Sequence, residues 1–244
     1  MSILITGGST GIGRGIATYF GARGADVFIN YFNNDTAADE TAETVQRNGG
    51  KPHLIKADVG TVDGVRQMIA EVKGLTDRLD QIVHCAAKPV QGPLLEVDAA
   101  DVERSVAVNG LALVHVVREA LPLLQRGSCI FYITSRGGRL AVPNYGAMGI
   151  PKALGDQITR YLALELAPKG IRANIISPGA LDTPALRAVF PDTFQERLRI
   201  GAEQNPSGRG LEFEDVAGVI DLMSRPEFAM VQGQYISIDG GNSL

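Results

Sequence analysis

Tryptophan is absent from the 244 residues of this chain, and cysteine occurs only twice. Cys85 and Cys129 each lie in an apolar run and form no C-x-x-C pair. That spacing indicates neither a zinc site nor a disulfide framework, so no metal is expected. So few thiols, both in apolar surroundings, favour a reducing, cytoplasmic location for the protein.

Runs of one charge sign are absent too. The formal net charge is -4 at pH 7, and its even spread indicates neither a nucleic acid nor a membrane surface as a partner. No apolar segment approaches the about 20 residues of a membrane span. No basic leader with a cleavage site precedes the apolar run that begins at Ile3. With 45% hydrophobic residues, we expect a single domain over residues 1–244.

What the sequence does contain is an alternation of short β-branched runs with longer amphipathic segments, which predicts an α/β fold with a parallel sheet. The expected strands are residues 2–6, 26–31, 52–57, 80–85, 129–134 and 234–238. The expected helices are residues 12–23, 36–47, 62–73, 99–124 and 212–224.

A glycine-rich turn follows the first expected strand. It contains the candidate cofactor-binding residues Gly7, Ser9, Thr10, Gly11, Ile12 and Gly13. A turn of this kind lets backbone approach a pyrophosphate, while the next helix presents its free N–H groups and positive dipole. The glycines could also serve only to turn the chain. Their position after the first strand of a βαβ pattern favours dinucleotide binding.

The second strand is expected to end at the adenosine ribose, where NAD-selective sites carry an acidic residue. This chain has Asn30 and Tyr31 there, with no carboxylate before Asp35. A phosphorylated ribose would meet no repulsion, so NADPH is favoured over NADH. No arginine stands in this loop, and Thr10 occupies the turn position where a basic residue would have decided the preference.

Two later strand ends are expected to complete the adenosine site. Asp58 and Val59 follow the third strand, where a carboxylate could accept a bond from the adenine amino group or simply begin the next turn. Small residues suited to close packing against the adenosine follow the fourth strand: Cys85, Ala86 and Ala87. His84 precedes them, and a histidine at a strand end is more often structural than catalytic.

Two further polar positions stand in or beside apolar runs. Asn109 lies in V-A-V-N-G-L-A-L, where its amide must find partners or weaken the helix; a helix distortion or a bound water chain would explain it. His115, in the same run, is expected to pack. Ser135 follows a strand and should therefore lie at the ligand-binding edge of the sheet, either bonding substrate or tyrosine or merely ending its strand.

Residues 134–152 hold the chemistry of the candidate site, because Ser135, Tyr145 and Lys152 lie close together in sequence. An unperturbed tyrosine titrates near pH ~10. A neighbouring ammonium favours the phenolate and lowers that pKa. The trio is therefore able to carry out acid chemistry beside a cofactor.

Taken together, these motifs resemble those of the short-chain dehydrogenase/reductase family over essentially the whole chain. The matching elements are T-G-x-x-x-G-I-G at residues 6–13, Asp58-Val59, the alanines at 86–87, Asn109, Ser135, residues 152–174, Ser177-Pro178-Gly179 with Thr183, and Asp239-Gly240-Gly241. The resemblance implies an NAD(P)H-dependent oxidoreductase with a single doubly wound α/β domain of the Rossmann type. Its sheet would be seven-stranded and parallel, with helices on both faces.

One departure from the family pattern is informative. Most members have a tyrosine four residues before the lysine, and matching the helix after residue 152 identifies Lys152 as that lysine. The tyrosine position is then Met148, whose thioether cannot donate a proton and which could simply fill a gap. Tyr145 gives Tyr-x6-Lys instead, which is similar to the enoyl-acyl-carrier-protein reductases of type III within the family.

The resemblance also assigns roles. Lys152 would bind the nicotinamide ribose, Pro178 and Gly179 would face the nicotinamide, and Thr183 would bond its carboxamide. In a continuous helix the seven-residue offset from Tyr145 rises about 10.5 Å, so coupling through the ribose is expected rather than a direct bond. Gly146, Gly149 and Pro151 are poor residues for a helix interior, so we expect an irregular or kinked turn over residues 145–150 with Pro151 near the first helical position.

The substrate side is an insertion at about residues 180–210, whose apolar residues at near-helical spacing predict a lid helix over an acyl pocket. They could equally pack on the core or on a partner subunit. The pattern favours an NADPH-dependent reductase of an enoyl thioester carried by acyl carrier protein or coenzyme A. A carbonyl reductase or alcohol dehydrogenase, and a non-catalytic NADP-bound regulatory protein, are the alternatives. The family resemblance implies a homotetramer, or a homodimer, formed through residues 98–124 and 152–167.

Overall fold

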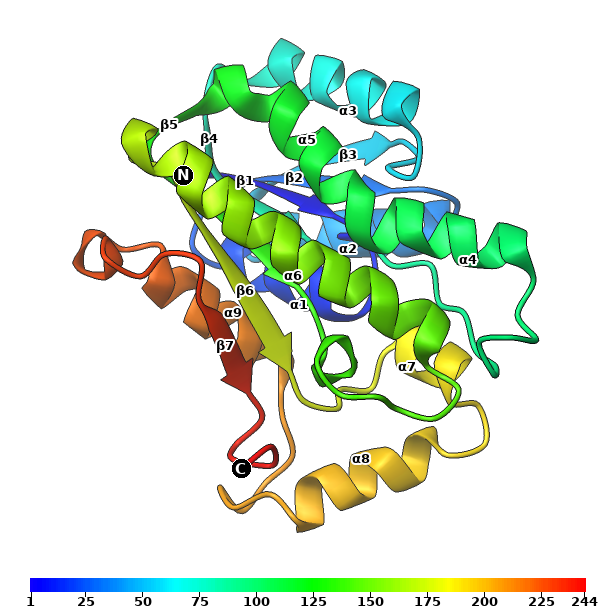
Figure 1. The fold of residues 1–244 in the computed structure, drawn as a ribbon. Helices are drawn as coiled ribbons and strands as arrows, with labels where there is room; N and C mark the ends of the chain where they lie inside the picture. The colour runs from blue at the N-terminus through cyan, green and yellow to red at the C-terminus, as the bar shows by residue number, and fades with distance from the viewer.

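The computed structural model describes residues 1–244, and its centre is one seven-stranded sheet in the order β3-β2-β1-β4-β5-β6-β7 (Figure 1). Every neighbouring pair is parallel. The strands are β1 (Ser2–Thr6), β2 (Asp26–Tyr31), β3 (Lys51–Lys56), β4 (Leu79–His84), β5 (Leu124–Ile133), β6 (Arg172–Pro178) and β7 (Tyr235–Ile238). The predicted doubly wound fold is confirmed.

The helices connect these strands and cover both faces of the sheet. The α-helices are α1 (Gly11–Gly21), α2 (Asp35–Arg47), α3 (Val62–Leu75), α4 (Ala99–Val106), α5 (Ala112–Ala120), α6 (Gly146–Leu166), α7 (Pro184–Val189), α8 (Phe194–Glu203) and α9 (Phe213–Met223). The shorter helical turns are η1 (Ala107–Leu111), η2 (Leu121–Leu123), η3 (Arg136–Gly138), η4 (Ala167–Lys169) and η5 (Pro226–Phe228). In Figure 1, α3 to α6 lie on the near side of the sheet, and α7 and α8 lie beyond the tips of β6 and β7.

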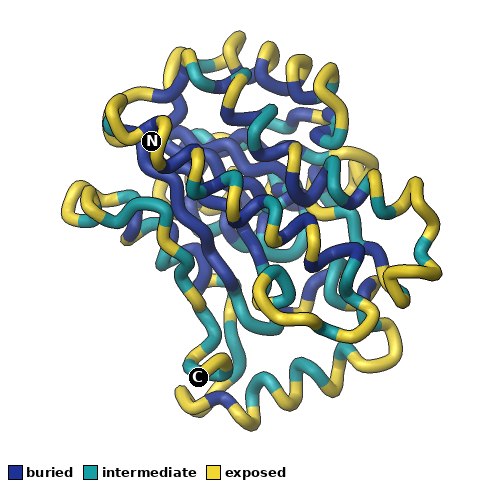
Figure 2. Tube along the Cα trace, in the orientation of Figure 1, coloured by how far each residue is buried: buried dark blue, intermediate teal, exposed yellow.

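Two hydrophobic cores form because successive side chains of a strand point to opposite faces. In β1, Ile3 and Ile5 join the core under α1 and α9, whereas Leu4 joins the core under α3, α5 and α6. Because both faces are covered, β1 has three consecutive apolar residues, Ile3 to Ile5, rather than an alternating pattern. Figure 2 shows this buried sheet, with the more exposed α8 segment outside it.

One apolar region is longer than the sequence suggested. The helical stretch Ala99–Leu123 has the length and hydropathy of a membrane span, so the expectation that no segment approaches that length is wrong. Half of its apolar window is buried inside the protein. A helix in the core of a protein can have the same length and hydropathy. Packing on α3 and α6 needs apolar residues, just as contact with lipid does.

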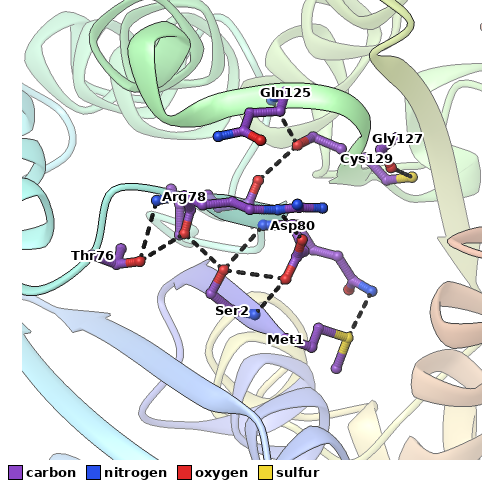
Figure 3. A network of polar contacts seen from close by, with 11 residues as sticks. Met1, Ser2, Thr76, Arg78, Asp80, Gln125, Gly127 and Cys129 are labelled. Atoms are coloured by element: carbon purple, nitrogen blue, oxygen red, sulfur yellow. Dashed lines mark hydrogen bonds and ion pairs between the residues drawn. The ribbon is translucent and has the colours of Figure 1, made fainter.

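A polar network fixes the amino ends of β1, β4 and β5, at the opposite edge from the ligand-binding edge (Figure 3). The Ser2 backbone N–H donates to Asp80 Oδ2 at 2.8 Å, and Arg78 Nε donates to Asp80 Oδ1 at 2.7 Å. Ser128 Oγ donates to Leu79 O at 2.7 Å. These contacts tie the start of β4 to its two neighbours in the sheet.

The helix distortion predicted at Asn109 is a π-helical turn, η1, between α4 and α5. Asn109 is fully buried, and its amide bonds both backbone groups of Lys88, at 3.0 Å from N and 3.1 Å to O. Tyr132 Oη donates to Asn109 O at 2.5 Å. The wider turn thus directs the amide to the loop after β4.

Residues 146–150 are helical, and the expectation of an irregular turn there is wrong. Helix α6 begins at Gly146, with Tyr145 at its N-cap and Pro151 inside it. A proline at that position leaves the carbonyl four residues earlier, Ala147 O, without its intrahelical donor. Ser105 Oγ donates to Ala147 O at 2.7 Å instead. A hydroxyl from α4 therefore makes the continuous helix possible.

Replacing Ser105 by alanine should lower the free energy of unfolding by about 1–3 kcal/mol, because Ala147 O is left buried without a donor. In a Pro151→Ala background the new backbone N–H can bond Ala147 O, so Ser105→Ala should cost less there. Urea unfolding of the four proteins of this cycle measures the coupling. An equal cost in both backgrounds would show that Ser105 does not replace the missing donor.

Candidate active site

A cavity of about 740 Å³ lies at the carboxyl edge of the sheet. Residues from the ends of β1 to β6, and from α7, line it. Its volume falls within the about 300–1,000 Å³ of ligand sites. It extends to both sides of the point where the strand order reverses, between β1 and β4, which is where open α/β sheets bind ligands.

The glycine-rich turn has the conformation that a pyrophosphate site needs. Gly7 and Gly11 have φ of 64° and 52°, a region that L side chains rarely adopt. A Cβ on Gly7 would lie 2.7 Å from Ala86 Cα. The N-terminus of α1 has no side-chain cap and no acidic residue in its first turn, so its free N–H groups and positive dipole are available to an anion.

Gly13 differs from its neighbours in the turn. It is buried and does not line the cavity, because helix α1 packs there on the backbone of Gly7. Ser9, Thr10, Gly11 and Ile12 do line it. Gly13 therefore allows close packing of α1 on the turn, and its predicted contact with a cofactor stays a prediction.

At the adenosine end, the buried side chain of Asn30 connects the ends of β1 and β3. Its Nδ2 donates to Ala57 O at 3.0 Å, and its Oδ1 lies 3.4 Å from the Gly7 backbone N. Tyr31 Oη donates to Asp35 Oδ1 at 3.0 Å. Lys56 Nζ also bonds Asp35, at 2.8 Å. The nearest carboxylate after β2 is therefore already paired.

Asp58 is also engaged, by a residue that the sequence patterns did not identify. Its Oδ1 accepts bonds from the Gly60 backbone N at 2.9 Å and from Arg104 Nη2 at 2.5 Å. Arg104 comes from α4, 46 positions further along the chain, so no local sequence motif predicts this ion pair. The one available signal was helical spacing: Arg104 lies one turn before the cavity residue Val108 and therefore on the same side of the helix.

The residues after β4 pack as expected. Cys85, Ala86 and Ala87 line the cavity, as does Val59 from the end of β3. His84 is fully structural: Thr6 Oγ1 lies 2.8 Å from its Nδ1, and its Nε2 lies 3.1 Å from Val108 O. Burial lowers the pKa of His84 to about 3, so the imidazole stays neutral.

Tyr145 and Ser135 meet in the cavity. Their hydroxyl oxygens lie 3.0 Å apart, although one precedes α6 and the other follows β5. The ring of Phe190, from the end of α7, stacks on Tyr145 with centroids 5.8 Å apart and planes 7° from parallel. Burial raises the pKa of Tyr145, and only the Ser135 hydrogen bond opposes this. The expected lowering by an ammonium is absent, so the phenol is a protonated donor.

Lys152 is buried but also lines the cavity. Its Nζ donates to Ile133 O at 2.8 Å, because helix α6 packs over the end of β5. Burial lowers the pKa of Lys152 to about 8. No hydrogen bond joins it to Tyr145, as the seven-residue offset predicted.

Met148 lines the cavity at the position of the usual family tyrosine and is 3% exposed. Its sulfur lies 3.4 Å from Asn109 Nδ2, on the side away from solvent. Asn109 itself does not line the cavity. It supports the wall from behind, so the structure gives this predicted catalytic residue no contact with the reacting space.

The nicotinamide end and the lid come from the segment after β6. Pro178, Gly179 and Thr183 line the cavity, and Thr183 Oγ1 caps α7 by accepting from Leu186 N at 3.0 Å. The single lid helix expected is two helices, α7 and α8. Helix α7 and Phe190 line the cavity, whereas no residue of α8 does.

These features fit a nicotinamide dinucleotide. The uncapped start of α1 offers its N–H groups to a pyrophosphate, and small residues line the adenosine end. Lys152 and Tyr145 both line the cavity as well. The cavity joins all three. The individual cofactor contacts stay predictions.

Comparison with known families gives one match across nearly the whole chain. The family described as "Enoyl-(Acyl carrier protein) reductase" matches residues 7–243. The chain is 31% identical over 241 residues to a 1-cyclohexenylcarbonyl-CoA reductase of Streptomyces collinus, covering 99% of this chain and 86% of the relative.

Other relatives carry different substrate names. A tetrahydroxynaphthalene reductase of Pyricularia oryzae is 28% identical over 249 residues, and the match covers 98% of this chain and 88% of the relative. A short-chain dehydrogenase of Burkholderia cenocepacia, solved in complex with NADP, superposes with a TM-score of 0.88 at 28% identity and covers 98% of this chain and 96% of that one. These likenesses share an oxidoreductase scaffold rather than one substrate.

Replacing Lys152 by methionine should remove a pH dependence of stability. Above pH about 8 the folded lysine is neutral, while the unfolded lysine stays charged up to about 10.5. The unfolded state then binds the extra proton, so wild-type stability rises with pH through that window. We expect a gain of roughly 3 kcal/mol relative to Lys152→Met between pH 8 and 10.5.

Denaturant midpoints of both proteins across pH 7 to 11 check this. A constant difference between them would mean that the ammonium is not desolvated in the folded protein.

Proposed function

The chain belongs to the short-chain dehydrogenase/reductase family, and on that premise we propose that it reduces the carbon–carbon double bond of an α,β-unsaturated acyl thioester with NADPH. The observation that carries the proposal is a pair of positions at the start of α6. A buried methionine, Met148, occupies the usual acid position, and Tyr145 is the N-cap residue of the helix. The other tyrosine that lines the cavity, Tyr31, follows β2 at the adenosine end.

Enoyl reduction needs its acid further from the hydride-accepting carbon than ketone reduction does. Hydride reaches the β-carbon, and negative charge develops on the thioester oxygen across the conjugated system. A donor acts best where that charge develops. Tyr145, one turn before the usual position, would donate a hydrogen bond from Oη to this oxygen, and Ser135 would orient the phenol. The enolate would then take a proton from water at the α-carbon, which completes the reduction.

Burial suits Tyr145 to this role. Its raised pKa keeps the proton on Oη at neutral pH, so the phenol donates rather than accepts. Phe190 covers one face of the ring and excludes water from it. A hydrogen bond in such surroundings is electrostatically stronger than in water.

When bound, the nicotinamide cofactor supplies the hydride. Lys152, whose Nζ now donates to Ile133 O, would hold the adjacent ribose hydroxyls. Thr183 would bond the carboxamide. The first turn of α1 would hold the pyrophosphate through its free N–H groups.

The preference for NADPH over NADH is part of the proposal. Asp35, the nearest carboxylate after β2, is bonded by both Lys56 and Tyr31, which reduces its repulsion of a ribose phosphate. The Burkholderia neighbour has NADP bound, which supports this choice.

The biological setting is proposed with the activity. The acyl group would be carried by acyl carrier protein or coenzyme A, in fatty-acid or specialised-metabolite synthesis. We propose a cytoplasmic homotetramer or homodimer without nucleic-acid or membrane partners. Contact through α4, α5 and α6 would cover exposed apolar side chains such as Leu111, Ile150 and Leu164.

A second candidate is carbonyl reduction, favoured by the likeness to the tetrahydroxynaphthalene reductase. It would require Tyr145 to move toward the Met148 side of the cavity. That movement would break the Ser135 contact and the stack on Phe190.

Tyr145→Phe should lower crotonyl-CoA reduction by about 10²–10³-fold, because one donor to the developing oxyanion is lost. NADPH affinity, measured by the fluorescence of the bound cofactor, should stay unchanged. Ser135→Ala should lower turnover less, since the phenol remains. Oxidation of NADPH followed at fixed pH gives these rates.

Full activity of Tyr145→Phe would contradict the mechanism. A ketone panel reduced faster than any enoyl thioester would establish the second candidate. Tight NADPH binding without turnover of thioesters or ketones would instead identify a regulatory protein.

A further inference from the structure

The adenosine end of the cavity has an unusual wall. Phe32, directly after β2, is 54% exposed although it lines the cavity. The guanidinium carbon of Arg104 lies over this ring, 5.9 Å from its centroid. An exposed aromatic face and a planar cation therefore face each other across the end of the site, from β2 and from α4.

Asp58 completes the group. Both of its hydrogen bonds, from the Gly60 N–H and from Arg104 Nη2, go to Oδ1. Its Oδ2 accepts no hydrogen bond within the protein, and Asp58 lines the cavity. Arg104 uses one of its five N–H donors on Asp58, and its guanidinium carbon lies over the Phe32 ring.

We propose that Phe32 and Arg104 clamp the adenine ring of the cofactor between the phenyl ring and the guanidinium, next to the Asp58 carboxylate already expected to meet the adenine amino group. The proposal rests on the proposed NADPH-dependent function and names how this chain holds the base.

The spacing supports the clamp. Two van der Waals contacts of about 3.5 Å each need roughly 7 Å between the flanking planes. The guanidinium carbon now lies 5.9 Å from the centroid of the Phe32 ring, so the two side chains must move apart by at least about 1 Å to admit a base. Phe32 is half exposed and Arg104 is held by a single ion pair, so both side chains can move apart. Without the base the pair covers the gap by its own cation–π contact.

The charge balance also suits a neutral base rather than a phosphate. The Arg104 charge is already offset by Asp58, and a second anion beside that carboxylate would be repelled. A planar heterocycle needs no net charge, because stacking on an aromatic ring and on a guanidinium depends on the π-face.

Binding of three probes tests the clamp: NADPH, NADH and ADP, each by isothermal titration. All three share the adenine, and only NADPH has the ribose 2′-phosphate. Phe32→Ala and Arg104→Gln should each weaken all three by a similar factor, about tenfold, as expected for loss of one stacking partner. Arg104→Lys should restore little, since an ammonium keeps the charge without the plane.

Two controls separate the clamp from simpler effects. Asp58→Asn with Arg104→Gln removes the carboxylate that the single variant leaves unpaired, and the loss should persist. Arg118→Gln, an exposed arginine on α5, should leave all three affinities unchanged. Thermal unfolding of each apoprotein reports whether a variant is folded.

Loss of NADPH affinity alone, with NADH and ADP unaffected, would overturn the clamp and make Arg104 a phosphate ligand. Unchanged ADP binding in Phe32→Ala would overturn it as well. A wild-type protein that binds neither NADPH nor NADH would instead refute the proposed function, so the two failures are distinguishable.

Discussion

The buried amide of Asn109 joins the parts on which the candidate site depends. It holds both backbone groups of Lys88 after β4, touches the sulfur of Met148 on α6, and donates to Ser105 Oγ at 2.7 Å. The π-helical turn η1 directs this amide into the protein interior. Because Ser105 also replaces the helix donor missing at Pro151, one cluster of hydrogen bonds supports the start of α6. The position of Tyr145 at the N-cap follows from it.

Burial then assigns the protonation states. The same low-dielectric interior that keeps His84 neutral lowers the pKa of Lys152 and raises that of Tyr145, because it disfavours whichever form carries charge. Lys152 and Tyr145 therefore do not act as a coupled ion pair in the protein alone. A phenol that keeps its proton, oriented by Ser135, is suited to stabilise an oxyanion rather than to be a pre-ionised acid.

Much of the fold was predictable because the strands and helices of an α/β fold alternate along the chain, and each has a local pattern of apolar residues. The bounds of β1 and β2 match the expected ranges, and the glycine turn has the positive φ values that its sequence implied. Helix α6 was not predictable at its start, since Gly146, Gly149 and Pro151 argue against a helix individually. The Ser105 hydroxyl that replaces the missing donor to Ala147 O is 42 residues away in sequence, beyond the reach of any rule based on neighbouring residues. The apolar residues of α8 left their role open for a related reason, because periodicity predicts a helix but not which surface it covers.

The sequence by itself determined the cofactor turn, the order of strands and helices, and the absence of a proton donor at Met148, because each depends on residue type and short spacing. Only the tertiary structure decided what surrounds these residues. It pairs Asp58 with Arg104, stacks Phe190 on Tyr145, and places Gly13 and Asn109 behind the cavity wall rather than in it. These outcomes depend on which distant segments the sheet brings to one edge, and side-chain packing across that edge is set by three-dimensional distance rather than by position along the chain.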